Sequence, residues 1–155
     1  MIDETFGYWF AGLTDGEGSF TLTYGNRPKF FPQPQFSLGF RDDEKKLIYM
    51  IQKHFGGIGS VYSNPKKYTN PQGYISNPVI MWMVNTRHDT QILVDFFHQY
   101  PLRSKKSRDF EVWAKAVELR NSGEWRGVRT PRIDAASAQM RKYAEELHRL
   151  KEYGA

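Results

Sequence analysis

The sequence predicts an α+β fold in which helices cover one face of an antiparallel four-stranded sheet and leave the other face free. Segments with apolar residues at three- and four-residue spacing alternate with segments of two-residue period, in the order α-β-β-α-β-β-α-α-α. In the first two predicted strands apolar side chains occupy one side only, as in a sheet with a single buried face. The 155 residues suffice for a single domain with a sizeable core.

The first helix is expected to begin at Asp3 or Thr5, either of which can cap it, and to end at about Thr14. Residues at helical spacing give it one apolar face: Phe6, Trp9, Phe10 and Leu13. Small residues lie beside that face: Gly7, Ala11 and Gly12. Because glycine inside a helix costs about 1 kcal/mol relative to alanine, this strip indicates a closely approaching partner helix.

Residues 15–18 read Asp-Gly-Glu-Gly. Their glycines are expected to end the helix and to bring backbone carbonyls beside a carboxylate on a tight turn. Carboxylate and carbonyl oxygens suit a hard cation such as Mg²⁺. A helix end without any metal explains the same residues, so this segment alone is weak evidence.

Strands are expected at 19–24, 35–41, 58–63 and 79–85, with a polar, turn-rich loop at 64–77. A helix is expected to start at Asp42 and Asp43 and to stop at 56–57, and another to run from a cap at Asp89 to residue 100. The basic turn 102–108 leads into a helix that closes at 121–123. An irregular stretch at 124–132 precedes a last helix from Asp134 to about 154. The core is thus expected at about 1–123, with a C-terminal helical extension at about 124–155.

Composition narrows the function classes. The net charge is +5 and the pI about 9.4, so a polyanionic partner is plausible, although charge alone says little. The absence of cysteine excludes disulfides, cysteine-based zinc sites and thiol nucleophiles, and the four scattered histidines show no paired ligand spacing. No apolar run reaches membrane-spanning length and the N-terminus lacks a signal-peptide pattern, so we expect a soluble, intracellular protein with no membrane partner.

Residues 10–18 read Phe-Ala-Gly-Leu-Thr-Asp-Gly-Glu-Gly. This run resembles the LAGLIDADG motif of homing endonucleases, with Phe for the first Leu, Thr for the second Ile and Glu for the final acid. The resemblance extends to about Gly123 and implies a saddle-shaped sheet in an αββαββα core, but it does not account for the final helix. It implies a site-specific endonuclease that hydrolyses double-stranded DNA at a long, near-palindromic site. The implied cofactor is Mg²⁺ or another divalent cation, such as Mn²⁺, or Ca²⁺ in complexes that do not cleave.

The resemblance also assigns site residues. The Glu17 carboxylate and the Gly16 carbonyl would hold the metal, which lowers the pKa of the attacking water and neutralises charge on the phosphate. Asp15 would be structural. A lysine is expected near the site in the turn before the penultimate helices, where we prefer Lys105 to Lys106. A polar residue beyond the second strand, Asp43 or Glu44, would position water, although acids at a helix N-terminus have an ordinary explanation.

The free face of the sheet would read base edges in the major groove. Alternation places seven polar side chains on it: Thr21, Thr23, Gln35, Ser37, Arg41, Ser60 and Tyr62. Loop residues would extend along the groove or hold phosphates: Asn26, Arg27, Lys29, Lys66 and Lys67. Each residue alone is more simply a solvated surface residue, so the prediction concerns the face as a whole.

One copy of the motif is present, so a homodimer is expected to form through the first helix. Its interface is predicted to comprise Gly7, Phe10, Ala11, Gly12 and Leu13, and two Glu17 carboxylates would lie near the axis. An RNA maturase or a DNA-binding regulator of the same fold, without cleavage, is the alternative. A basic domain that binds protein is a third reading, for which the predicted free face is too polar.

Overall fold

The structure is a computed structural model, which describes residues 2–24, 31–64, 67–122 and 135–155. Its four-stranded antiparallel sheet has the spatial order β1-β2-β6-β3. These strands are β1 (Gly18–Thr23), β2 (Gln33–Arg41), β3 (Ser60–Asn64) and β6 (Val79–Val84). The helices are α1 (Glu4–Glu17), α2 (Lys45–His54), α3 (Arg87–Gln99), α4 (Lys106–Asn121) and α5 (Ala135–Leu150), and a short 3-10 helix, η1 (Asp42–Glu44), precedes α2. The predicted class and the order of the main elements are confirmed.

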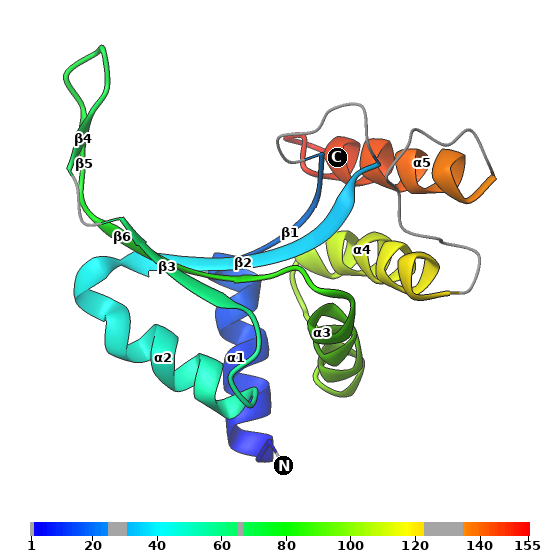
Figure 1. Ribbon diagram of the computed structural model, residues 1–155, viewed down its shortest axis with the longest axis horizontal. Helices are drawn as coiled ribbons and strands as arrows, with labels where there is room; N and C mark the ends of the chain where they lie inside the picture. Colours follow the sequence, from blue (N-terminus) through cyan, green and yellow to red (C-terminus); the bar gives the residue numbers. More distant parts are fainter. Residues whose placement is uncertain (1, 25–30, 65–66, 123–134) are drawn as a thin grey trace.

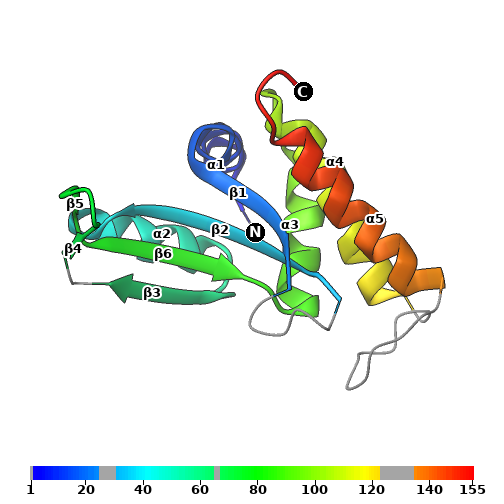
Figure 2. The same cartoon turned by 90° about the horizontal axis from the view of Figure 1, so that it is seen from above.

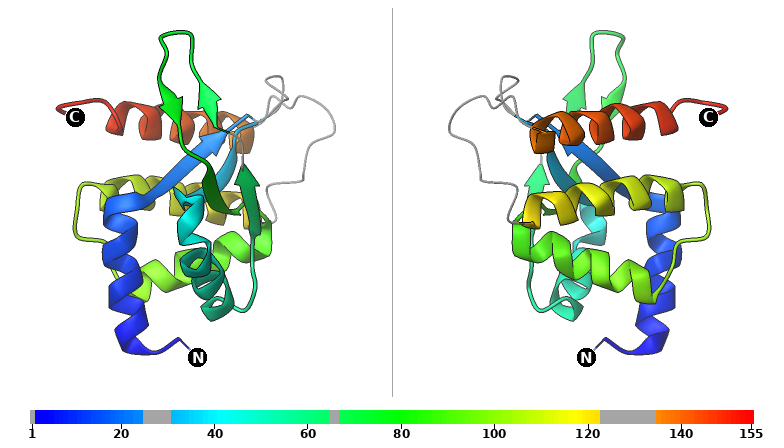
Figure 3. Two further views of the ribbon diagram at one scale, coloured as in Figure 1. Left: turned by 90° about the vertical axis from the view of Figure 1, so that its left-hand side faces the viewer. Right: turned by 90° about the vertical axis from the view of Figure 1, so that its right-hand side faces the viewer.

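The elements lie in layers. Figure 1 shows α1, α2 and α3 beneath the sheet, while β1 and β2 bend upward at one end so that the opposite face is concave. Helices α4 and α5 lie beyond that bend, with α5 packed along α4 (Figures 2 and 3). A two-stranded ribbon, β4 (Tyr68–Thr69) with β5 (Ile75–Ser76), projects from the other end. None of the helices in the described ranges has the length and apolar character needed to cross a membrane.

The main core lies between the sheet and the helices beneath it. Phe20 of β1, Phe36 of β2 and Val84 of β6 form one cross-strand row, and all three are fully buried. Phe10 of α1 packs on this surface, with its ring centroid 6.4 Å from that of Phe36 and 6.1 Å from that of Trp82. Full burial of such a side chain is worth about 1.5–3 kcal/mol. The row therefore fixes α1 against the sheet.

A second, smaller core joins α5 to the rest of the molecule. Met140 of α5 packs with Ala116 of α4 and with Phe31, and all three are buried. The ring of Phe31 also lies 5.1 Å beneath the guanidinium carbon of Arg141. These contacts seat α5 on α4 and bring its last residues toward the end of α1.

A buried arginine ties α4 to the junction of β6 and α3. The guanidinium of Arg120 donates to the carbonyl of Asn85 at 2.9 Å, to the carbonyl of Thr86 at 3.1 Å and to the hydroxyl of Thr90 at 2.6 Å. Burial, with a smaller effect of the charge of Arg87, lowers the pKa of Arg120 to about 10. The residue thus remains charged at neutral pH and serves as a structural tie.

Three local predictions were wrong. Helix α1 does not end at Thr14 but continues to Glu17, and Gly18 enters β1 in an extended conformation, with φ −73° and ψ 154°. The segment 64–77 is not only loop, because it contains the β4–β5 ribbon. Asp89 does not cap α3: the hydroxyl of Thr86 accepts from the Asp89 amide, while the Asp89 carboxylate accepts from the amide of Gly59 at 3.1 Å. The start of the last helix at Asp134 lies outside the described residues.

Candidate functional site

The end of α1 is held by Asp15. Its carboxylate accepts hydrogen bonds from the amide of Arg103 at 2.9 Å, from the amide of Ser104 at 3.1 Å and from the hydroxyl of Ser104 at 2.6 Å. Partial burial opposes ionisation of Asp15, but these hydrogen bonds, with the charge of Lys106, outweigh it and lower the pKa of the carboxyl group. Asp15 therefore anchors α1 to the turn that precedes α4, in agreement with the structural role expected for it.

Glu17 is the last residue of α1 and is exposed. Its neighbour Gly18 must be a glycine because of close packing: an added Cβ would lie 2.6 Å from Cγ2 of Thr14 and 3.1 Å from Cε2 of Phe36. The Gly18 amide donates to the Thr14 carbonyl and so closes the helix at Glu17. The carboxylate thus follows a rigid helix and not a loose turn.

Lys106 lies against this helix end. Its ammonium nitrogen is 3.1 Å from the Thr14 carbonyl oxygen and 3.5 Å from the Gly16 carbonyl oxygen. Burial lowers the pKa of Lys106, and the charges of Asp15, Asp109 and Glu17 partly offset that effect. A carboxylate, the last carbonyl groups of α1 and a partly desolvated ammonium group therefore lie close together.

Of the two lysines considered, the geometry places Lys106 and not Lys105 at the end of α1. Lys105 is exposed and its ammonium group donates to the Ala155 carbonyl at 3.4 Å, so it is directed away from the motif. Lys106 is the first residue of α4, where its amide donates to the Ser104 hydroxyl at 3.1 Å. Because consecutive helical residues differ by about 100° around the axis, only one of the two can face α1.

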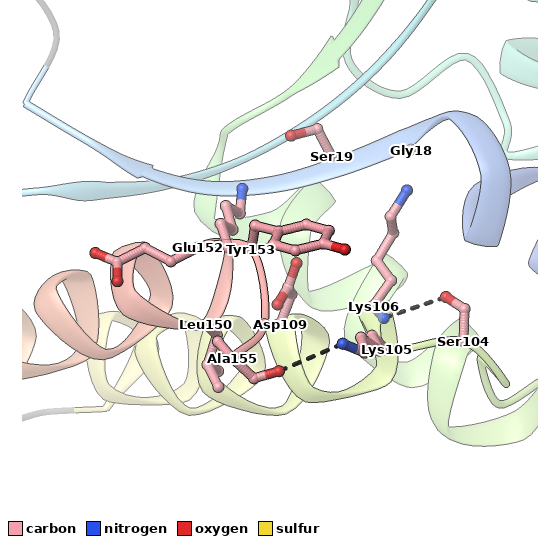
Figure 4. Close-up of a pocket in the computed structure, with 12 residues that line it drawn as sticks. Gly18, Ser19, Ser104, Lys105, Lys106, Asp109, Leu150, Glu152, Tyr153 and Ala155 are labelled. Carbon is pink, nitrogen blue, oxygen red and sulfur yellow. Dashed lines mark hydrogen bonds between the residues drawn. The ribbon is translucent and has the colours of Figure 1, made fainter.

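A cavity of about 760 Å³ adjoins this point. Its walls come from three parts of the chain: Gly18 and Ser19, residues 104–106 with Asp109, and residues 150–155. Figure 4 shows Asp109 on α4 facing the turn that follows Leu150, while Lys106 on the same helix extends toward Gly18. Burial raises the pKa of Asp109, against the lowering effect of the charges of Lys151, Lys106 and Arg108.

The concave face of the sheet carries the side chains that alternation assigned to it. Ser37 lies beside Ser19 on β1 and Met83 on β6, and Ser60 pairs with Met83 from the far side. Thr21 pairs with Gln35, and Tyr62, whose surface is 56% exposed, pairs with Met81. Thr23 and Arg41 lie toward opposite ends of the same face.

Sequence reasoning missed the centre of this face. Met81 and Met83 of β6 are half-buried there, and Val79 is exposed at its end. The strand is apolar at every position, so alternation in polarity could not show which residues face outward. The face is therefore polar at β1, β2 and β3 and apolar along β6.

Asp43 is not brought to Glu17. It lies beyond the end of β2, where its carboxylate pairs with the guanidinium of Arg41 at 2.5 Å. The pair lines a separate hollow with Asp42 and Lys45, and neither residue lines the cavity at Gly18. Asp43 and Glu44 belong to η1, which explains these acids as the start of a helical segment. The prediction that Asp43 acts beside Glu17 thus has no support in the geometry.

The predicted loop residues are mostly outside the description. Asn26, Arg27, Lys29 and Lys66 lie among the residues that the structure does not describe. Lys67 is exposed directly before the β4–β5 ribbon. Its place on the projecting ribbon is compatible with a contact to an extended partner.

The face of α1 assigned to a dimer interface needs correction. Phe10 and Ala11 are buried in the chain's own core, and a Cβ on Gly7 would lie 2.4 Å from the ring of Tyr100. The close approach that Gly7 permits is therefore intramolecular. Gly12 is exposed with open space around it, and Leu13 is half-buried. The exposed strip of α1 instead comprises Thr5, Tyr8, Trp9, Gly12 and Gly16.

Metal-binding capacity in the described residues is limited. No group of three or more histidine or acidic side chains gathers there in a way that could hold a metal ion. Any ion at the end of α1 would have Glu17 and the Gly16 carbonyl as its ligands from this chain.

Comparison with known proteins identifies the family of this chain. A model of the LAGLIDADG endonuclease family matches residues 10–117. The chain is 26% identical over 117 residues to probable intron-encoded endonuclease 3 of Neurospora crassa, covering 73% of this chain and 20% of that protein. It is 25% identical over 122 residues to probable intron-encoded DNA endonuclease 1 of Mycosarcoma maydis, covering 76% and 40%. The chain thus spans between a fifth and two fifths of the length of these relatives.

Solved structures share the fold. The LAGLIDADG homing endonuclease I-GzeII in complex with its DNA target superposes with a TM-score of 0.67 and 24% identity, over 91% of this chain and 43% of that chain. An archaeal intron-encoded homing endonuclease complexed with DNA gives a TM-score of 0.71 and 21% identity, over 99% and 89%. Since the family model covers more than half of the sequence, the chain belongs to the LAGLIDADG endonuclease family.

Proposed function

We propose that this chain is a site-specific endonuclease that hydrolyses phosphodiester bonds of double-stranded DNA at a long, near-palindromic site, as a homodimer. The observation that carries the proposal is the end of α1. There an exposed acid, Glu17, stands beside the Lys106 ammonium group and directly before a strand of the free sheet face. The DNA-bound structures of homologous fold, and the names of the curated relatives, support DNA as the substrate.

A divalent cation fits this place in its donor chemistry. Glu17 offers a carboxylate with no hydrogen bond or ion pair in the described part of the chain, and Gly16 offers a carbonyl. Oxygen ligands of this kind suit Mg²⁺, which keeps several waters and binds phosphate oxygens in addition to protein ligands. When bound, the ion would lower the pKa of water and offset charge on the phosphate. A crystal structure of I-SmaMI with uncleaved DNA was obtained in the presence of calcium ions, so divalent ions are compatible with such complexes.

Lys106 and Asp15 have separate tasks in this proposal. The Lys106 ammonium group would stabilise negative charge that develops on the phosphate, an effect strengthened in a partly desolvated site. Asp15 holds the turn that carries Lys106 against α1 and so fixes the distance between this cation and Glu17.

The concave sheet face would lie in the major groove. Gln35 and Arg41 have the side chains that pair with adenine and guanine edges, respectively. In the free protein Arg41 is held by Asp43. Because both side chains of that ion pair are largely exposed, at 69% and 61%, exchanging the pair for a contact between Arg41 and a base edge costs little free energy. Asp43 would then act as a positioning residue for Arg41 and not in catalysis.

The exposed strip of α1 would form the homodimer interface. Tyr8 and Trp9 are 54% and 40% exposed, and Gly12 and Gly16 follow on the same side of the helix. Large rings next to residues without side chains give one helix a ridge and a groove for a second copy. The two Glu17 residues would then lie close to the twofold axis, one for each DNA strand.

The test is selection of cleaved sites from a randomised duplex library with Mg²⁺, followed by the same assay on Glu17→Gln. We expect cleavage at a discrete near-palindromic site and a loss on the order of 10²-fold or more in Glu17→Gln, with binding retained. Lys106→Met should also slow cleavage strongly, whereas Lys105→Met should have a small effect. Glu118→Gln, at an exposed position near the other end of α4, is the matched control and should cleave normally.

Two outcomes would contradict the proposal. Tight, salt-dependent binding without cleavage by the unaltered chain would indicate a maturase or a regulator of this fold. Full cleavage by Glu17→Gln would exclude Glu17 as the metal-binding acid.

A further inference from the structure

The residues that follow α5 return to the end of α1. The cavity beside Gly18 and Ser19 is closed on one side by residues 150–155, which lie far from the motif in the sequence. The family model ends at residue 117, so this wall is not part of the matched region. This wall contains a positively charged side chain that has no role in the proposed cleavage reaction.

That side chain is Lys151. Its ammonium group donates a short hydrogen bond to the Phe20 carbonyl on β1. β1 is an edge strand of the sheet, and it pairs with β2 on its other side. Although Lys151 is an exposed residue overall, its charged end is thus turned inward onto the strand that Glu17 and Gly18 lead into.

Lys151 is electrostatically coupled to the site already described. Partial burial lowers the pKa of Lys151, as does the like charge of Lys106, and Asp109 acts in the opposite direction. Lys106 and Lys151 therefore share one carboxylate, Asp109, whose pKa burial raises. Among the residues that line the cavity, three are cationic (Lys105, Lys106 and Lys151) and two are acidic (Asp109 and Glu152), so positive charge is in excess there.

An excess of positive charge favours the binding of an anion in the cavity. The present acceptor of Lys151 is a neutral carbonyl, and hydrogen bonds between ionised partners are roughly twice as strong as those between neutral ones. A phosphate oxygen that entered the cavity could therefore replace the Phe20 carbonyl at a gain in free energy.

We propose that Lys151 is a DNA-contacting residue that binds one backbone phosphate of the cleaved strand in the cavity beside Gly18 and Ser19. The inference rests on the proposed function, because the phosphate belongs to the DNA that Glu17 would cut. It gives α5 a role in positioning the substrate, in addition to its packing on α4.

The test is a double-mutant cycle between protein and DNA. The duplex is the selected target, with a neutral methylphosphonate placed in turn at the scissile position and at each neighbouring phosphate, and binding is measured in Ca²⁺. We expect Lys151→Met to weaken binding about 10-fold. At one phosphate position the methylphosphonate should weaken binding of the unaltered chain by a similar factor, but should weaken binding of Lys151→Met no further.

Two variants separate this role from a structural one. Lys151→Arg keeps the charge, so a methylphosphonate at that one phosphate position should again weaken binding, as it does for the unaltered chain. Lys142→Met removes a charge from an exposed position earlier in α5 and should show equal, additive losses at every position. Additive losses for Lys151→Met as well would overturn the proposal, since a residue that only pins α5 to β1 has no preference among phosphates.

The unaltered protein supplies a second readout that does not depend on a variant folding. Acetylation of lysines by an amine-reactive ester, read by mass spectrometry, should decrease at Lys151 when target duplex is added, while Lys142 labels as before. Equal labelling of Lys151 with and without DNA would also overturn the inference. If the unaltered chain neither binds nor cuts any duplex, it is the proposed function that fails.

Discussion

Two glycines of α1, Gly7 and Gly12, lie on different sides of the helix and should respond in opposite ways to the same added methyl group. Gly7 faces the interior and Gly12 faces solvent, so Gly7→Ala and Gly12→Ala make the same chemical change in two environments. Alanine favours the helix by about 0.5–1 kcal/mol at either position. Any difference between the variants therefore reports on what surrounds the new methyl group.

At Gly7 the methyl group would meet a ring that has little room to move. Its Cβ would lie 2.4 Å from Cε1 and Cζ of Tyr100, whose ring centroid is 5.0 Å from that of Phe96 and 5.2 Å from that of Tyr8. Overpacking of this kind costs about 1–3 kcal/mol. After the gain in helix propensity, Gly7→Ala should lose about 0.5–2 kcal/mol of unfolding free energy, measured by urea denaturation.

At Gly12 the methyl group would have no atom within 4 Å in the part of the chain that the structure describes. Under conditions where the protein is monomeric, Gly12→Ala should therefore be more stable by about 0.5–1 kcal/mol. In the proposed homodimer the same methyl group would hold the two helices apart, and by symmetry it occurs twice. A total cost of about 1–3 kcal/mol corresponds to a dissociation constant raised about 5-fold to 150-fold, measured by analytical ultracentrifugation.

The results that refute this reasoning are distinct. A gain in stability for Gly7→Ala would show that Tyr100 does not confine this position. An unaltered monomer–dimer equilibrium in Gly12→Ala, or a monomeric unaltered chain, would place the interface elsewhere or exclude the homodimer.

Two further predictions concern the same helix end. Asp15 has a lowered pKa, so its contribution to stability is complete above the unfolded value of about 3.8 and is lost as the pH falls through the folded value. Asp15→Asn should therefore be less stable at pH 7, by about 1 kcal/mol once solvent screening is allowed for, and the difference should shrink toward pH 3 in thermal melts. A stability difference between Asp15→Asn and the unaltered chain that stayed constant from pH 7 to pH 3 would show that the ionised Asp15 carboxylate does not stabilise the fold. Thr14 is fully buried and its hydroxyl oxygen has no hydrogen-bond partner in the described structure, so Thr14→Val should raise the unfolding free energy by about 1 kcal/mol without loss of cleavage. Destabilisation by Thr14→Val would show that the Thr14 hydroxyl group makes a hydrogen bond in the folded protein.

The sequence could predict the sheet because its strands obey a simple rule. Phe20 and Phe36 alternate with Ser19 and Ser37, so the buried and free faces follow directly from the order of residues. The rule fails at β6, where both faces are apolar, and it fails for the β4–β5 ribbon, whose paired segments have only two residues each. In these segments the polarity of the residues does not show which face of the sheet a side chain points to. That direction is set by tertiary packing.

The end of α1 shows a different limit. Local propensity favours a stop at the glycines after Thr14, but the Asp15 carboxylate is bound by amides 88 and 89 residues away, and that attachment keeps the helix intact to Glu17. For the same reason, the sequence could not show which of Lys105 and Lys106 faces α1. That depends on where α4 begins, which is set by the turn that docks onto Asp15.

These contacts explain how two acids that are two residues apart come to differ in chemistry. Residues two apart on a helix point about 200° from each other, so Asp15 and Glu17 cannot both face the turn before α4. Asp15 faces that turn, and its carboxylate accepts three hydrogen bonds from it, whereas Glu17 remains exposed. The anchoring acid thereby brings Lys106 to the carbonyl edge of the helix without neutralising the acid that would hold the metal. The rotational position of each residue at the end of α1 and the start of α4 therefore depend on each other. Insertion of a residue between Asp15 and Glu17 should abolish cleavage while leaving Phe10 packed against Phe36 and Trp82.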